Sequence, residues 1–182
     1  MCPILAVFPS SGVFTLTEEH QLMKGFLLTT IPKLGKEWRI KFEIKPSKFT
    51  GTNNNIIHLT STDKDEYITN GDRIPIILFE DNKLYVRSSV NGKPNYKKIF
   101  TDVLSLNQWT RIEVVQHMVD DDYIFSISIG GKELHSHSVV NTQPMEFTDV
   151  KVYASSPWFQ TCKMSEILPE QDFHFQILPE SA

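Results

Sequence analysis

Cysteine is scarce in this sequence, which has two, Cys2 and Cys162, one near each end of the chain. Two buried thiols would be one explanation. Because the first and last strands of a β-sandwich often lie side by side, a disulfide between Cys2 and Cys162 is the other, and we predict it. Closing so long a loop would stabilise the fold by about 4–5 kcal/mol in the chain-entropy model, and it would indicate an oxidising compartment.

Positive charge is also in short supply. The sequence has 18 Lys and Arg against 22 Asp and Glu, a formal net charge of −4. No basic run is interleaved with aromatic residues, so we expect no nucleic acid partner. The same balance makes an acidic polymer a poor candidate ligand.

Long apolar runs are missing too. The longest, Ile4 to Phe8 and Ile74 to Phe79, fall far short of the ~20 residues of a membrane helix, so we expect a soluble chain without membrane insertion. Met1 to Phe8 has no basic n-region and too short an apolar stretch for a secretory signal. We expect an extracellular, secreted protein because of the predicted disulfide, and in that case its signal peptide is not part of this sequence.

Several catalytic patterns are absent. The sequence has no G-x-S-x-G, no phosphate-loop or dinucleotide glycine pattern, and no cysteine in an activating context. These absences favour a protein that is not an enzyme.

Alternating apolar and polar residues are what the sequence does contain. In Glu37 to Lys45, every second residue from Trp38 is apolar and the residues between are charged, which predicts a strand with one buried face. Trp109 to Leu134 holds two such runs around Asp120-Asp121-Asp122, and Gly130-Gly131 follows, so it predicts a hairpin and a third strand. Gln21 to Thr30 fits a helix or a strand; we favour the strand.

Strands recur every 8–12 residues or so, and no segment is suited to a crossover helix. We therefore predict an all-β protein in which residues 1–182 form a single jelly-roll β-sandwich of two antiparallel sheets, with about a dozen strands. The aromatic content, 12 Phe, 5 Tyr and 3 Trp, is enough to fill the core between the sheets.

The order of several short motifs resembles that of the concanavalin A-like jelly rolls, most closely the laminin G-like and pentraxin-type modules. The motifs run from about Leu34 to Pro157: Leu34-Gly35-Lys36-Glu37-Trp38, Asn55 to Thr60, Gly71-Asp72-Arg73-Ile74-Pro75, Leu106-Asn107-Gln108-Trp109, Ile129 to Leu134, and Phe147 to Ser155. The resemblance implies an extracellular module that binds carbohydrate or protein, often with calcium at the sandwich rim. It implies no catalytic residues, and the E-x-D-x-x-E strand of the related glycoside hydrolases is absent.

Calcium is the one cofactor that the residues themselves suggest. Asp63, Asp65 and Asp72, with Glu66, lie within ten positions and offer the hard oxygen ligands that calcium takes. A solvated acidic loop is the alternative, since Lys64 interrupts the cluster. Asp120-Asp121-Asp122 is best explained as a polar hairpin tip.

The candidate ligand-binding surface is the Tyr85 and Arg87 face, next to Tyr96 and Lys98. The full set of candidate ligand-binding residues is His58, Tyr67, Arg73, Tyr85, Arg87 and Tyr96, since aromatic rings can stack on sugars or anchor a protein interface. His135 and His137 share a strand face at a zinc-compatible spacing, but no further ligand is near in sequence, so we expect them at the surface.

Together these observations predict a non-enzymatic extracellular recognition module for a glycan or a protein partner, with calcium as a candidate cofactor. The alternative is a structural or assembly subunit of a matrix, coat or toxin, a homo-oligomer built through homotypic contacts of the sandwich.

Overall fold

A computed structural model describes residues 14–16, 24–46, 54–80, 83–101, 104–130, 135–158 and 175–179. Their strands, in chain order, are β1 (Phe14–Leu16), β2 (Phe26–Leu34), β3 (Trp38–Ile44), β4 (Asn54–Thr60), β5 (Ile76–Glu80), β6 (Lys83–Val90), β7 (Lys93–Thr101), β8 (Thr110–Val119), β9 (Asp122–Ile129), β10 (Ser136–Val140), β11 (Phe147–Ala154) and β12 (Phe175–Pro179). The part of the chain described here holds no helix long and apolar enough to span a membrane.

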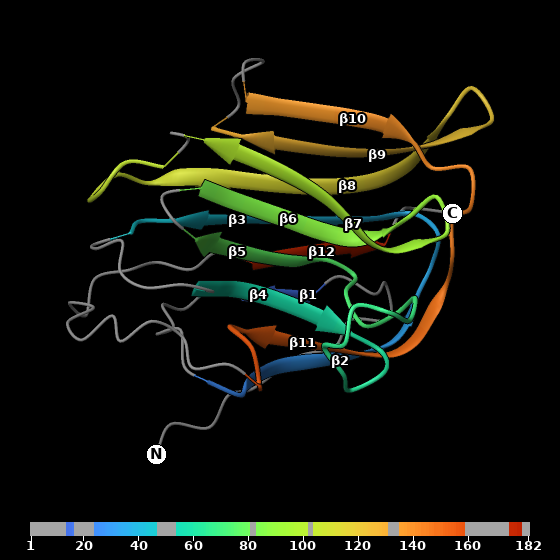
Figure 1. Ribbon diagram of the computed structural model, residues 1–182, viewed down its shortest axis with the longest axis horizontal. Coiled ribbons are helices and arrows are strands. Elements are labelled where there is room, and N and C mark those ends of the chain that lie inside the picture. The colour runs from blue at the N-terminus through green and yellow to red at the C-terminus, as the bar shows by residue number, and fades with distance from the viewer. Residues whose placement is uncertain are drawn as a thin grey trace.

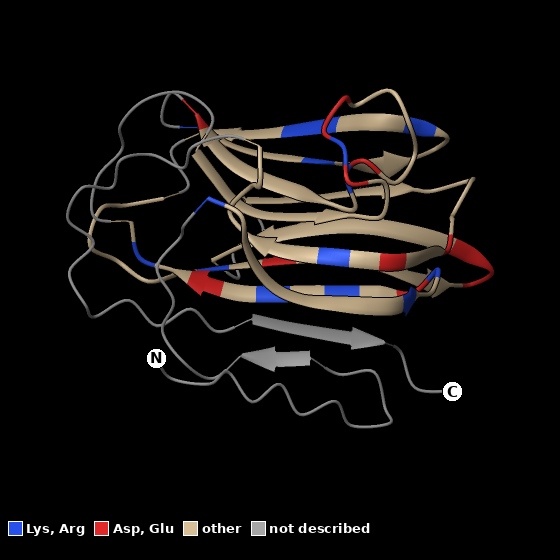
Figure 2. Ribbon diagram, turned by 90° about the horizontal axis from the view of Figure 1, so that it is seen from below, with Lys and Arg blue, Asp and Glu red and all other residues tan. Residues whose placement is uncertain are grey.

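The strands form two sheets of six. Sheet A has the order β1-β12-β3-β8-β9-β10, and sheet B has the order β2-β11-β4-β5-β6-β7. In Figure 1 one sheet lies in front of the other, and Figure 2 shows them from below as two stacked layers. Every paired strand is antiparallel to its neighbour, so the prediction of an all-β jelly-roll sandwich is confirmed.

The two-residue period of the sequence decides which side chains enter the core. In β3, Trp38 and every second residue after it are buried, while Arg39 is exposed. The Trp38 ring meets Phe125 of β9 edge to face, with ring centroids 6.2 Å apart. The sequence of Gln21 to Thr30 fitted a helix or a strand. In the structure its residues from Phe26 onward belong to strand β2, as we predicted.

Two hairpin turns follow the predicted turn chemistry. Asn91 and Gly92 join β6 to β7, and both have positive φ, as do Asp120 and Asp121 between β8 and β9. Two successive positive φ values define the turn that suits the twist of paired strands. The three aspartates of the second turn are exposed, which confirms them as a polar tip. At Gly92 a Cβ would lie 2.3 Å from Oε1 of the exposed Gln143 side chain, which would have to move to make room.

A buried side-chain network joins the sheets at the end where this Asn91 turn lies. Asn141, 2% exposed, accepts from the Asn91 and Gln143 backbone N–H groups at 2.8 and 3.2 Å. Its Nδ2 donates to Gln116 Oε1 at 2.6 Å, and Gln116 Nε2 donates to the Lys36 carbonyl at 2.6 Å. Both polar atoms of the Asn141 side chain are paired. The network therefore satisfies the hydrogen-bonding groups of segments that are far apart in sequence.

We predict that Asn141→Leu lowers the free energy of unfolding by about 2–4 kcal/mol, because it leaves Gln116 Oε1 and two backbone N–H groups without partners. Denaturant unfolding followed by fluorescence measures the change. Thr142→Ala is the control: it removes an exposed hydroxyl, and we expect about 1 kcal/mol or less. Equal stability of Asn141→Leu and the unmodified protein would contradict the role given to this network.

Candidate functional site

The outer face of sheet B carries three of the six predicted ligand-binding residues, His58, Tyr85 and Arg87. His58 lies between Ile57 and Leu59, which belong to the core, so its side chain is on the opposite face. Strand register extends this face across the whole sheet. One row of cross-strand neighbours runs from edge to edge, in the order Leu27, Tyr153, His58, Ile76, Arg87 and Lys97. We call these six residues the outer row.

Tyr85 and Arg87 are on this face, but Tyr96 is not, so the prediction that all three share a surface is wrong. The β6–β7 register places Tyr85 opposite Ile99 and Arg87 opposite Lys97. Tyr96 pairs with the buried Ser88 and packs against Phe125 in the core, with centroids 6.2 Å apart. The physical reason is the period of two, since a one-residue difference in alignment moves a side chain to the other face.

Tyr96 instead connects the two sheets. Its hydroxyl is 2.7 Å from Nε2 of His137 in β10, and the two rings are stacked. His137 was expected at the surface; it is half-buried, and burial, with a contribution from Lys98, lowers its pKa. The described residues offer no group of three or more His, Cys, Asp or Glu side chains that could hold a metal ion.

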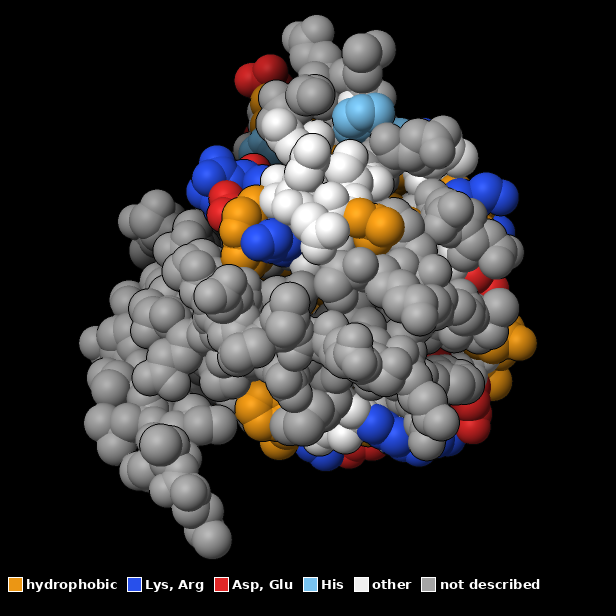
Figure 3. Space-filling model, turned by 90° about the vertical axis from the view of Figure 1, so that its left-hand side faces the viewer, with side chains coloured by type: hydrophobic (Ala, Val, Ile, Leu, Met, Phe, Trp, Pro, Cys, Tyr) orange, Lys and Arg blue, Asp and Glu red, His pale blue; other side chains and the backbone are white. Residues whose placement is uncertain are grey.

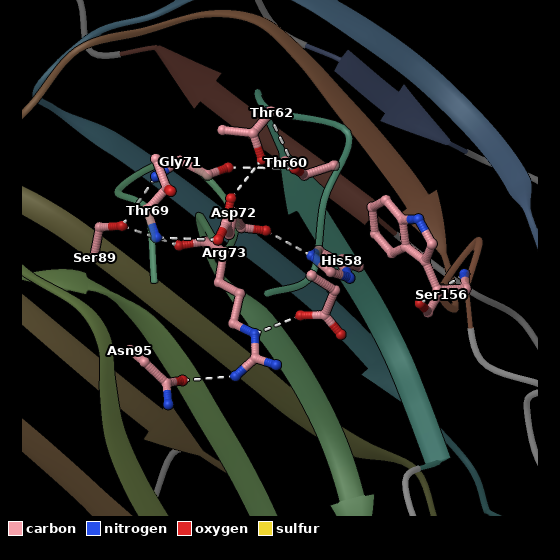
Figure 4. Close-up of polar contacts among 12 residues, drawn as sticks. His58, Thr60, Thr62, Thr69, Gly71, Asp72, Arg73, Ser89, Asn95 and Ser156 are labelled. Atoms are coloured by element: carbon pink, nitrogen blue, oxygen red, sulfur yellow. Dashed lines mark hydrogen bonds and ion pairs between the residues drawn. The ribbon is translucent and has the colours of Figure 1, made fainter. Parts of the chain in front are cut away.

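The loop between β4 and β5 is built around Asp72, whose side chain is fully buried (Figure 4). The carboxylate accepts from Thr62 Oγ1 at 2.6 Å and from the Thr69 backbone N–H at 3.1 Å. The preceding residue, Gly71, has a φ of 105°, and a Cβ there would lie 2.5 Å from Ser61 Oγ. The Asn70-Gly71-Asp72 turn signal therefore marks a position that only glycine fills without strain.

Arg73 anchors the same loop to β7. Its Nε donates to Asp65 at 2.6 Å and its Nη1 donates to Asn95 at 2.6 Å. The side chains of Arg73 and Asp65 are only 5% and 4% exposed, so this is a buried ion pair. The Arg73 guanidinium also lies 5.0 Å from the centre of the Tyr67 ring. Tyr67 itself is 54% exposed at the loop surface, next to Ile68 at 69%.

His58 lies under this loop. Its Nε2 donates to the backbone carbonyl of Asp72 at 2.8 Å, and its ring centroid is 5.2 Å from that of Trp158. Nδ1 is buried without a hydrogen-bond partner. Burial lowers the pKa of His58 below its ordinary value, because a proton on Nδ1 would add an unsolvated charge. His58 is therefore a neutral structural residue that supports the loop.

The three aspartates proposed as calcium ligands have separate partners. Asp63 pairs with Lys151, Asp65 with Arg73, and Asp72 with Thr62 and the Thr69 N–H. The structure thus shows no shared ligand set among these carboxylates, and calcium binding remains a prediction. Cys2 and Cys162 lie outside the described residues, so their bridge also remains a prediction. The first and last described strands, β1 and β12, do pair, as the prediction of a terminal bridge assumed.

Sequence reasoning missed Asn95, Lys97 and Ile99 of β7. Their part in the outer face depends on the β6–β7 alignment, which includes an irregularity between Ser88 and Val90. Counting outward from the Asn91-Gly92 turn would pair Arg87 with Tyr96. The irregularity shifts the pairing by one residue, so that Arg87 pairs with Lys97, and no sequence signal indicated it.

No protein-family model matches the sequence, and no curated protein is similar enough to count as a relative. Among solved structures, the receptor-binding domain of botulinum neurotoxin D has a TM-score of 0.52 and 11% identity, over 99% of this chain and 44% of that domain. The galectin LEC-6 of Caenorhabditis elegans has a TM-score of 0.48 and 12% identity, over 96% of this chain and 100% of the galectin. A heptameric SAP-like pentraxin from Limulus polyphemus has a TM-score of 0.47 and 15% identity, over 94% of this chain and 76% of the pentraxin.

The chain spans 42% of the length of the type G neurotoxin receptor-binding domain and 44% of the type D domain, so it corresponds to less than half of each. At these identities, the similarity to the type D domain establishes the β-sandwich fold and nothing about ligands.

The His58 environment predicts a pH dependence of stability. The ordinary His pKa is 6.5, and the folded state holds His58 below it. Below about pH 6.5 the unfolded chain therefore binds a proton that the folded chain resists, and the free energy of unfolding falls as the pH falls. Above that pH the ring is neutral in both states, and this contribution is fully retained.

We expect His58→Gln to reduce this loss, since the Gln amide can still donate to Asp72 and does not titrate. Urea unfolding at about pH 7 and about pH 5 compares the two proteins. His135→Gln is the control for loss of a histidine elsewhere. An unchanged pH dependence in His58→Gln would contradict the assignment.

Proposed function

We propose that this chain is a non-enzymatic recognition module that binds a glycan on the outer face of sheet B, beside the Asp72 loop. The observation that carries the proposal is the buried Arg73–Asp65 pair with its Asn95 contact. Arg73 also lies 5.0 Å from the ring centre of the exposed Tyr67, and through Asn95 it ties this loop to sheet B, whose outer face carries Tyr85 and Arg87. Side chains held in place before binding lose less conformational entropy when the ligand arrives.

The composition of the face supports binding rather than catalysis. The outer row has an aromatic, a histidine, two aliphatic and two cationic residues, and no carboxylate. Glycosidic hydrolysis ordinarily needs a pair of carboxyl groups facing one bond. A tyrosine ring, by contrast, gives a sugar an apolar surface with a polar edge. The extracellular location belongs to this proposal, and it is supported by the family resemblance of the motifs.

Tyr85→Ala tests the proposal. We expect it to reduce affinity for the best ligand of a glycan array by about tenfold, because a half-buried ring of the binding face is lost. The Kd is measured by calorimetry, with the melting temperature as the folding check. Tyr123→Ala, in β9 of sheet A, is the matched control. An array without any bound glycan, or equal losses for both variants, would reject glycan binding at this face.

A second function, assembly of identical subunits, is favoured by one sheet edge. Of the edge strands, β2 contains Pro32 and Lys33, and β7 contains Pro94 and three lysines. Proline and lysine protect an edge against pairing with another chain, and β1 has only three residues. β10, the sequence SHSVV, has neither protection, and Val140 is 39% exposed.

Figure 3 shows the end of the sandwich at which β10 begins, where uncharged polar side chains and backbone gather near the top with charged side chains beside them. An antiparallel β10–β10 pairing would continue sheet A into a second copy and create a closed two-fold dimer.

If subunits assemble in this way, sedimentation velocity will show a larger species whose share rises with protein concentration, without ligand. The double variant Ser138→Lys/Val140→Lys will remain monomeric, because it places like charges opposite each other in the paired edges. Lys41→Gln on the outer face of sheet A is the control. A monomer at every concentration would dismiss assembly as the function.

A further inference from the structure

Two cations stand side by side on the outer face of sheet B. Arg87 of β6 and Lys97 of β7 are directly opposite each other in the strand register. Like charges in directly opposite positions destabilise a sheet, typically by some tenths of a kcal/mol. Among the described residues, no carboxylate lies within ion-pair distance of either cation. The fold therefore keeps a local excess of positive charge in a chain whose net charge is −4.

The outer face of sheet A provides an internal comparison. There Arg39 pairs with Glu113 at 3.1 Å, and Arg111 pairs with Glu43 at 2.9 Å. Lys41 stands directly opposite Glu113 in the register. Charge is thus balanced across neighbouring strands of sheet A, whereas the β6–β7 pair of sheet B lacks the acid that would balance it.

The surroundings of Arg87 make it a suitable anion-binding group. Its neighbour across β5 is the buried, apolar Ile76, and its guanidinium lies 5.6 Å from the centre of the Tyr85 ring. Nε is buried without a hydrogen-bond partner. Burial, and then the nearby Arg73, lower the pKa of Arg87, and the attraction of Glu80 and Asp65 offsets this only in part. A guanidinium in a partly apolar site binds an oxyanion more strongly than one in open water.

Arg73 does not compete for the same ligand. Its charge is met by Asp65, and its Nη1 donates to the side-chain carbonyl oxygen of Asn95, both at 2.6 Å. Glu80 and Asp65 attract Arg87 electrostatically, but neither forms an ion pair with it. Arg73 is thus paired, whereas neither Arg87 nor Lys97 has an ion-pair partner among the described residues.

We propose that this face binds an acidic glycan, with the carboxylate or sulfate group of one sugar between Arg87 and Lys97 and the sugar ring beside Tyr85. The inference rests on the proposed glycan-binding function and names its ligand class. The net charge alone argued against an acidic ligand. The local arrangement reverses that expectation, because binding strength depends on the charges near the ligand when salt screens those beyond about 8–10 Å.

Four oligosaccharides test whether binding depends on a carboxylate, on a sulfate or on the sugar alone. Hexagalacturonate carries carboxylates, and its methyl ester is the neutral match. A carrageenan hexasaccharide carries sulfates, and the same hexasaccharide after desulfation is its neutral match. We expect at least one acid to bind with a Kd about tenfold below that of its neutral match, with affinity falling as salt rises.

Arg87→Gln should then weaken binding of that acid by about tenfold, and Arg87→Lys by less, because lysine keeps the charge and loses the planar fork. Lys97→Gln changes an exposed side chain, so it keeps the test valid if Arg87→Gln fails to fold; we expect it to weaken binding by about threefold. Lys41→Gln on sheet A is the matched control and should have no effect.

The possible results distinguish a wrong ligand class from a failure of glycan binding itself. If neutral and acidic oligosaccharides bind equally, and Tyr85→Ala weakens both, glycan binding stands and the acidic ligand class is wrong. If Lys41→Gln weakens binding as much as Lys97→Gln, the attraction is to overall charge and the assigned site is wrong. If neither these four probes nor the glycan array give any binding, the proposed function itself fails.

Discussion

The burial of the Asp72 carboxylate is the constraint on which the candidate site depends. A buried carboxylate needs donors, and Asp72 obtains them from Thr62 and from the Thr69 backbone, the two sides of its own loop. Its carbonyl also fixes the His58 ring, which stands on β4. The loop is thereby folded onto the sheet, and Arg73, the next residue, is delivered to Asp65 and Asn95. The exposed Tyr67 takes its position as a result of these buried contacts.

The fold could be predicted because it follows from local patterns. Alternation in Glu37 to Lys45 specifies a half-buried strand whatever its neighbours are, and the Asn91-Gly92 and Asp120-Asp121 turns specify hairpins from two residues each. The β2 strand shows where this reasoning weakens, because Gln21 to Thr30 carries helical and strand spacing together. Only the pairing of β2 with β11 resolves the choice.

The site was predicted in part, because side chains acquire neighbours that sequence distance does not indicate. Tyr85 and Arg87 were placed together correctly, since residues two apart in a strand share a face. Tyr96 was misplaced by one position in the β6–β7 alignment. The acidic cluster looked like a set of metal ligands, but Lys151 and Arg73, which neutralise Asp63 and Asp65, come from another strand and from the far end of the loop. The pairing of Gln116 with Asn141 was equally invisible, because it spans separate strands and a turn.

The contact between Tyr96 and His137 has a mechanical consequence. Tyr96 belongs to β7 and His137 to β10, the strands that end sheet B and sheet A on the same flank. Packed elements can move relative to each other by small sliding displacements. On this flank such sliding would have to break a hydrogen bond and separate two stacked rings, so a pull on the outer face of sheet B is transmitted to sheet A. The sandwich would then bear load as one body.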